Sequence, residues 1–154
     1  MGREIERKFL VDVGRWRPRD EGVLLVQGYL SSAKERVVRV RIEGTLAKLT
    51  IKGINRGITR SEFEYDIPFD DARAMLAICE YPLLEKRRHR EVHDGKLWEI
   101  DVFGGENEGL VLAELELAAE DEAFTTPPWI TQEVSDDARY YNANLVHAPF
   151  KSWT

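Results

Sequence analysis

Two carboxylates and an ammonium alternate along the segment EIERKFLV (residues 4–11), as Glu4, Glu6 and Lys8. Because successive side chains of a β-strand point to opposite faces, these three charges would share one face of a strand. Carboxylate oxygens bind hard divalent cations, and ammonium or guanidinium groups bind phosphate oxygens. The segment therefore carries groups suited to chemistry on a phosphate with bound metal.

The same two-residue spacing of charge recurs in six other segments. Its positions are Arg39, Arg41, Lys48, Lys52, Arg60, Glu62, Glu64, Lys86, Arg88, Glu99, Asp101, Glu114 and Glu116. Any one segment could be an ordinary amphipathic strand with its charged face in water. However, paired carboxylates and paired cations fall largely on different segments, whereas solvated faces usually mix both signs with Ser, Thr and Gln. This segregation favours a shared charged face that is turned inward.

An inward charged face requires a closed sheet, and eight meandering strands can form a barrel whose interior is a channel. Burying uncompensated charge costs several kcal/mol per ion, so the charges of the channel must neutralise each other or an occupant. A polyphosphate with divalent metal ions carries charges of both kinds and fits this requirement.

The elements that position these charges are predicted from period-2 runs between turn signals. About eight strands are expected, near residues 3–11, 23–31, 36–43, 46–53, 58–67, 83–92, 96–103 and 110–118. Short connections favour an antiparallel meander, and the Asp94-Gly95 pair tolerates the positive φ of a tight hairpin. Helices are predicted over 70–80 and 135–147, with a short one over 120–124. The pattern predicts a mainly β (α+β) fold.

Length and composition limit the classes of protein. The 154 residues suit one domain, residues 1–154, and the lone Cys79 excludes an internal disulfide. A net charge of -6 argues against general nucleic-acid binding, and no apolar run is long enough to cross a bilayer. The charged amino terminus lacks the apolar segment of a secretory signal. We therefore expect a cytoplasmic protein with no nucleic-acid or membrane partner.

Two short motifs have simpler interpretations than their appearance suggests. KRRHR (residues 86–90) is typical of RNA-binding or nuclear-localisation patches, but a strand would divide it between the channel and the surface. His89 and His93 have the spacing of a helical zinc pair, but Asp94-Gly95 marks a hairpin where that helix would have to run. We expect neither RNA binding nor zinc.

Glu4-Ile5-Glu6-Arg7-Lys8 matches the ExExK signature of the CYTH superfamily, the triphosphate tunnel metalloenzymes, and EIERKFLV resembles its bacterial inorganic triphosphatase branch. The resemblance covers nearly the whole chain in order. It continues through QGYL (27–30), VRVRI (38–42), LTIK (49–52), TRSEFEYDI (59–67), LEKRRH (84–89), WEIDVF (98–103), AELEL (113–117) and DARYYN (137–142).

The resemblance implies an eight-stranded antiparallel β-barrel forming a charged tunnel, with a few flanking helices and a C-terminal helix. It implies hydrolysis of inorganic triphosphate to pyrophosphate and phosphate with Mg²⁺ or Mn²⁺. The metal-site carboxylates carried over by position are Glu4, Glu6, Glu62, Glu64, Asp101, Glu114 and Glu116. The phosphate-binding residues carried over are Lys8, Arg39, Arg41, Lys52, Arg60, Lys86, Arg88 and Arg139.

Within these sets, Lys8 or Lys86 would steady the leaving oxygen and Glu64 would orient the attacking water. Arg139, in the C-terminal helix, would close one end of the tunnel. Tyr141 stands where some relatives have Lys, which puts in doubt a second cation from that helix.

Other functions remain open from the sequence. The same tunnel would serve a nucleoside or thiamine triphosphatase or a class IV-type adenylate cyclase, although no feature identifies a pocket for a base or a thiamine ring. A non-catalytic polyphosphate-binding module would need the cations but hardly so many paired carboxylates. A homodimer is compatible with the sequence.

Overall fold

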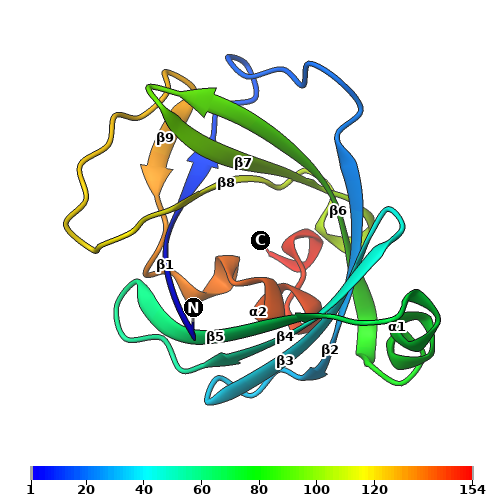
Figure 1. Ribbon diagram of the computed structural model, residues 1–154. Helices are drawn as coiled ribbons and strands as arrows, with labels where there is room; N and C mark the ends of the chain where they lie inside the picture. The colour runs from blue at the N-terminus through cyan, green and yellow to red at the C-terminus, as the bar shows by residue number, and fades with distance from the viewer. Residues whose placement is uncertain (1, 154) are drawn as a thin grey trace.

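A single antiparallel sheet forms most of the computed structural model, which describes residues 2–153 (Figure 1). Within that range the strands are β1 (Gly2–Val11), β2 (Val23–Ser31), β3 (Arg36–Glu43), β4 (Leu46–Gly53), β5 (Thr59–Asp66), β6 (Glu80–His93), β7 (Lys96–Phe103), β8 (Val111–Glu116) and β9 (Ile130–Glu133). The helices are α1 (Phe69–Leu76) and α2 (Asn142–His147), with short 3₁₀ turns at Gly105–Asn107, Ala138–Tyr140 and Phe150–Ser152.

The sheet closes on itself and so confirms the predicted eight-stranded antiparallel barrel. The strand order is β5-β4-β3-β2-β6-β7-β8-β1-β9, and an additional β5–β1 pairing joins the two ends. The first half of β1 pairs with β5, from Gly2 opposite Glu62 to Ile5 opposite Thr59. From Glu6 onward β1 also pairs with β8. β1 is therefore the strand that closes the ring.

The hairpin between β6 and β7 forms where the sequence predicts it. Asp94 and Gly95 both adopt positive φ, at 50° and 75°, as a two-residue hairpin turn requires. The register that follows places Arg88 opposite Asp101 and Arg90 opposite Glu99. This turn thus sets opposite charges side by side on the inner face.

Apolar side chains pack on the outside of the barrel and across one of its ends. An aromatic cluster around Phe9, Trp98 and Trp129 lies against the wall formed by β1, β7 and β8. α1 packs on β3 and β4 through Ala72. Leu145 and Val146 of α2 join a further cluster, and Figure 1 shows α2 within the outline of the ring of strands. The core therefore surrounds the lumen and leaves most of its length free for polar groups.

Three local predictions are wrong. Residues 120–124 form no helix, because the Glu122 carboxylate accepts from the Ala118 amide and Lys96, and Phe124 packs against Trp98. The helix predicted over 135–147 is instead a 3₁₀ turn followed by α2. The short strand β9 was not predicted, because its four residues, ITQE, carry too little alternation. Among the described residues, no helix combines the length and apolar character needed to cross a membrane.

Candidate active site

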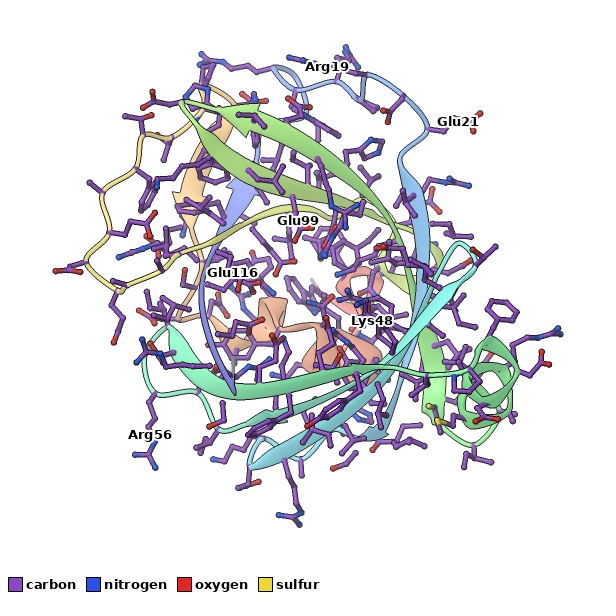
Figure 2. All side chains as sticks on the ribbon, viewed as in Figure 1. Arg19, Glu21, Lys48, Arg56, Glu99 and Glu116 are labelled. Atoms are coloured by element: carbon purple, nitrogen blue, oxygen red, sulfur yellow. The ribbon has the colours of Figure 1, made fainter. Side chains whose placement is uncertain are left out.

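The barrel lumen contains a cavity of about 650 Å³. In Figure 2, Glu99, Glu116 and Lys48 lie within the ring of strands, whereas Arg19 and Arg56 lie at its periphery. Two predicted site residues, Asp101 and Arg139, do not line the cavity. Those that do are Glu4, Glu6, Lys8, Arg39, Arg41, Lys52, Arg60, Glu62, Glu64, Lys86, Arg88, Glu114 and Glu116.

Glu4 lies at the junction of β1, β4 and β5 among charges of both signs. Lys52 Nζ donates to both oxygens of Glu4 at 3.1 Å, and Arg60 Nε lies 3.6 Å from Oε1. Burial opposes ionisation of Glu4, but Lys52 and Arg60 outweigh it and lower its pKa to about 2. Burial and the Glu4 charge raise the pKa of the neighbouring Glu62 to about 7. Glu4 is therefore ionised at neutral pH, whereas Glu62 exchanges its proton near neutral pH.

Glu6 and Glu114, on the adjacent strands β1 and β8, form a second carboxylate pair. Burial and the Glu114 charge raise the pKa of Glu6 well above its usual value. Burial also acts against Glu114, but Lys8 and a hydrogen bond from Glu6 keep its pKa well below the usual value. The two carboxyl groups thus share one proton, as close like charges do when no cation separates them.

Asp101 is fully buried behind the cavity wall and binds two cations that face the lumen. Its oxygens accept from Arg88 Nε and Nη2 at 2.8 Å, and Lys86 Nζ forms an ion pair with Oδ2 at 2.8 Å. Arg88 also contacts Glu114 and Glu99, each at 3.1 Å. Burial opposes the charge of Arg88, but Asp101 and Glu114 raise its pKa well above the usual value. Asp101 therefore orients two lumen cations from behind the cavity wall.

Arg39 and Glu64 are joined through the buried Thr50. The Thr50 hydroxyl accepts from Arg39 Nη2 at 3.2 Å and donates to Glu64 Oε2 at 2.9 Å. Arg39 Nε is buried and has no hydrogen-bond partner among residues 2–153. Thr50 thus fixes one edge of a guanidinium that lines the cavity, and a positive group oriented in this way is suited to binding an anionic oxygen.

Arg41 lies next to Arg39 along the inner face of β3. Its Nε donates to the buried Gln27 Oε1 at 3.3 Å, and Gln27 Nε2 donates to the Tyr29 hydroxyl at 3.2 Å. Burial and repulsion by Arg39 lower the pKa of Arg41 to about 10. The two arginines therefore repel each other, which an anion between them would relieve.

The C-terminal segment closes one end of the cavity through Lys8 and Lys86. Lys8 Nζ donates to the Tyr140 carbonyl at 3.1 Å, and Lys86 Nζ donates to Asn142 Oδ1 at 3.0 Å. Burial lowers the pKa of Lys86 to about 8 despite the attraction of Asp101. Both ammonium groups are thus held at the closed end of the lumen.

The placement of Arg139 differs from the prediction that it closes the tunnel. Its side chain is 63% exposed and pairs with Asp137 at 2.7 Å. Its guanidinium lies over the rings of Tyr140 and Trp153 on the outer side of the 3₁₀ turn. The turn exposes Arg139 because Ala138 and the segment beginning at Tyr141 occupy the lumen side.

Several charged residues that the proposed site omitted also line the cavity. Lys48 contacts Glu64 at 3.7 Å, and Arg90 contacts Glu99 at 3.0 Å and Glu43 at 3.4 Å. Lys48 and Glu99 already belonged to the predicted charged face, and Arg90 lies two residues beyond Arg88, so the alternation alone indicated all three. Gln27, Thr50 and Asn142 carried no such signal, because their role depends on a neighbouring strand or helix.

The donor set fits a divalent cation. Among residues 2–153, no group of three or more His, Cys, Asp or Glu side chains is gathered into a ready-made metal site. However, Glu6 with Glu114 and Glu4 with Glu62 form close carboxylate pairs that retain a proton. Mg²⁺-type ions commonly bind one or two carboxylates and complete their coordination with water and phosphate oxygens. Paired carboxylates beside cations therefore suit a metal that arrives with a phosphate.

The comparisons with known proteins agree over almost the full length. A family model described as CYTH domain matches residues 2–143. The chain is similar to an inorganic triphosphatase of Acetivibrio thermocellus, with 46% identity over 154 residues that cover 99% of each protein. It is 38% identical to an inorganic triphosphatase of Nitrosomonas europaea, over 92% of this chain and 95% of that protein.

A comparison with solved structures gives the same result. The crystal structure of the inorganic triphosphatase NE1496 matches with a TM-score of 0.65 and 37% identity, covering 93% of each chain. The similarity thus extends over nearly the whole length of both chains.

Proposed function

The chain belongs to the CYTH domain family, and we propose that it hydrolyses inorganic triphosphate to pyrophosphate and orthophosphate inside the barrel. The supporting observation is the cavity of about 650 Å³, whose inner wall presents cations and paired carboxylates from nearly every strand. A small polyanion with bound metal would neutralise both sets. The relatives named above as inorganic triphosphatases support this substrate.

The cations of the lumen would hold the phosphate oxygens. Arg39 lines the cavity with its guanidinium oriented by Thr50, and Arg41 lies beside it under mutual repulsion. Lys52, Arg60 and Arg88 would bind further oxygens while their carboxylate partners keep them oriented. Preorganised donors of this kind stabilise the charge that develops in phosphoryl transfer without reorganising during the reaction.

The paired carboxylates would hold Mg²⁺ or Mn²⁺. The residues assigned to this role are Glu4, Glu6, Glu62, Glu114 and Glu116. Such an ion neutralises phosphate oxygens and lowers the pKa of an attacking water. Asp101 is left out of this set, because it is fully buried and does not line the cavity.

Three side chains have assigned roles in the reaction itself. Lys86 or Lys8, at the closed end of the lumen, would donate to the leaving phosphate oxygen. Glu64 would accept a hydrogen bond from the attacking water through Oε1, because its Oε2 already accepts from Thr50. This arrangement places the attacking and leaving groups at different parts of the cavity wall.

We further propose that residues 1–154 act as one catalytic unit in the cytoplasm, on a small-molecule substrate and without nucleic-acid or membrane partners. The strand divides the basic segment KRRHR (residues 86–90) between two faces, which supports the absence of a nucleic-acid partner. Lys86 and Arg88 line the cavity, and only Arg87 is exposed on the outer face. The basic run therefore offers no continuous surface to a nucleic acid.

Purified protein incubated with tripolyphosphate is expected to release orthophosphate with Mg²⁺ or Mn²⁺ and to stop when EDTA is added. Parallel reactions with ATP and thiamine triphosphate, and an assay for cyclic AMP, compare the alternative substrates. Faster turnover of an organic triphosphate, or cyclic AMP formation, would replace inorganic triphosphate as the substrate. Tight tripolyphosphate binding with no turnover under any divalent metal would instead indicate a binding module.

Replacing Arg39 with glutamine is expected to raise the KM for tripolyphosphate about 10- to 100-fold, because one charge-assisted contact to phosphate is worth about 1.5–3 kcal/mol. The matched control is Arg139→Gln, which removes an arginine outside the cavity and should leave KM within about twofold, since exposed contacts contribute little. Steady-state phosphate release measures both. Equal effects of the two substitutions would contradict the placement of Arg139.

A further inference from the structure

The outer wall of β3, β4 and β5 carries an apolar surface that no other part of the described chain covers. Val38, Ile51 and Phe63 lie side by side in one row across the three strands, and Tyr65 extends the surface along β5. Ile51 is 37% exposed, Phe63 47% and Tyr65 57%. α1 covers the neighbouring Val40 but leaves this part of the wall in solvent (Figure 1). We call these four side chains the β3–β5 surface.

Charges of opposite sign flank the β3–β5 surface at its two ends. Arg3 and Arg36 are exposed at the two ends of the cross-strand row that contains Ser61. This row lies next to the apolar row, because Ser61 is two residues before Phe63 on β5. Asp70 and Asp71 are exposed in the first turn of α1, beyond the opposite end of β5. Among residues 2–153, none of these four charges has a salt-bridge partner.

We propose that the β3–β5 surface binds a second copy of this chain in a two-fold symmetric dimer. A two-fold axis near Tyr65 reverses the direction of β5 in the partner. Tyr65 of one copy then lies opposite Tyr65 of the other, each apolar row packs beside this contact, and the basic end of each copy meets the acidic end of the other. A two-fold interface must be self-complementary, and equal numbers of opposite charges at the two ends of an apolar centre satisfy that condition.

The distribution of charge favours a second copy over an unrelated partner. A basic or acidic partner would be attracted to one end of the surface and repelled by the other. None of the four side chains of the β3–β5 surface lines the cavity, so the dimer does not use residues of the proposed active site. The dimer is independent of the proposed reaction.

The decisive experiment reverses the charges at one end of the surface in each variant and measures the oligomeric state by sedimentation velocity. The wild-type protein is expected to sediment as a dimer at micromolar concentration. In a dimer of the double variant Arg3→Glu/Arg36→Glu, acidic side chains would meet acidic side chains at both ends. In a dimer of Asp70→Arg/Asp71→Arg, basic side chains would meet basic side chains. Each alone is expected to dissociate at least tenfold more readily, and an equimolar mixture of the two is expected to restore the dimer.

Restoration on mixing distinguishes the proposed surface from simple misfolding, because two misfolded variants would not repair each other. The matched control Arg17→Glu/Arg19→Glu reverses two arginines in the β1–β2 loop and should leave the dimer unchanged. Phe63→Lys tests the apolar centre and should also give monomers that retain triphosphatase activity. A monomeric wild-type protein, or a mixture that stays monomeric, would overturn the proposal.

Discussion

Replacing Glu4 or Glu116 with glutamine is expected to lower metal-dependent phosphate release from tripolyphosphate by about 10²- to 10³-fold, the size of effect seen when one preorganised electrostatic group is removed. An amide keeps the shape of the side chain but supplies no anionic oxygen to a divalent cation. Both carboxylates line the cavity, and burial together with the Glu4 charge raises the pKa of Glu116. The effect should appear mainly as a lower kcat and a higher metal concentration for half-maximal phosphate release.

The fold is expected to survive both substitutions. Without the charge of Glu4, Lys52 keeps Glu62 at 3.4 Å, and the repulsion that helps to raise the pKa of Glu62 disappears, so Glu62 ionises. Thermal unfolding monitored by circular dichroism checks this. Glu85→Gln, on the outer face of β6, is the matched control and should keep full activity. Activity within threefold of wild type in both lumen variants would remove these carboxylates from the mechanism.

Replacing Asp101 with asparagine is expected to destabilise the protein by about 3–5 kcal/mol, the cost of leaving buried charge without its partner. Asp101 is fully buried, and the substitution leaves Lys86 without its carboxylate and Arg88 without its bidentate partner. Urea unfolding followed by Trp fluorescence measures the loss. Phosphate release should fall as well, because Lys86 and Arg88 lose the group that orients them.

Two companion variants separate burial from charge. Asp66 contacts Lys48 at 3.1 Å but is 86% exposed, so Asp66→Asn should cost less than about 1 kcal/mol. Adding Lys86→Met to Asp101→Asn removes one unpaired ammonium and should recover part of the lost stability. An Asp101→Asn protein as stable as the Asp66→Asn protein would show that Asp101 is not the anchor of this cluster.

The alternation of charge could be read from local sequence because it depends only on strand geometry. Glu4, Glu6 and Lys8 share a face in any extended strand, whichever strands become its neighbours. The hairpin at Asp94 and Gly95 is equally local, since its residues tolerate the positive φ of the turn. The resemblance to a known family then identified the inward face and most of the lumen residues.

The local predictions that are wrong depended on contacts between distant segments. Residues 120–124 have helix-compatible composition, but Lys96 and the aromatic cluster hold them as a loop. β9 forms because the end of β1 offers it a pairing edge, not because of its own pattern.

By itself, the sequence determined eight of the nine strands within residues 2–153, the charged face and the pairing of carboxylates and cations along it, because backbone geometry assigns alternate side chains to opposite faces. Only the tertiary structure decided that Asp101 lies behind the lumen, that Arg139 lies outside it, and that Gln27, Thr50 and Asn142 hold the cations in place. Those roles depend on which strand or helix lies opposite each side chain, and the closure of β1 against β5 sets that arrangement across more than fifty residues of chain.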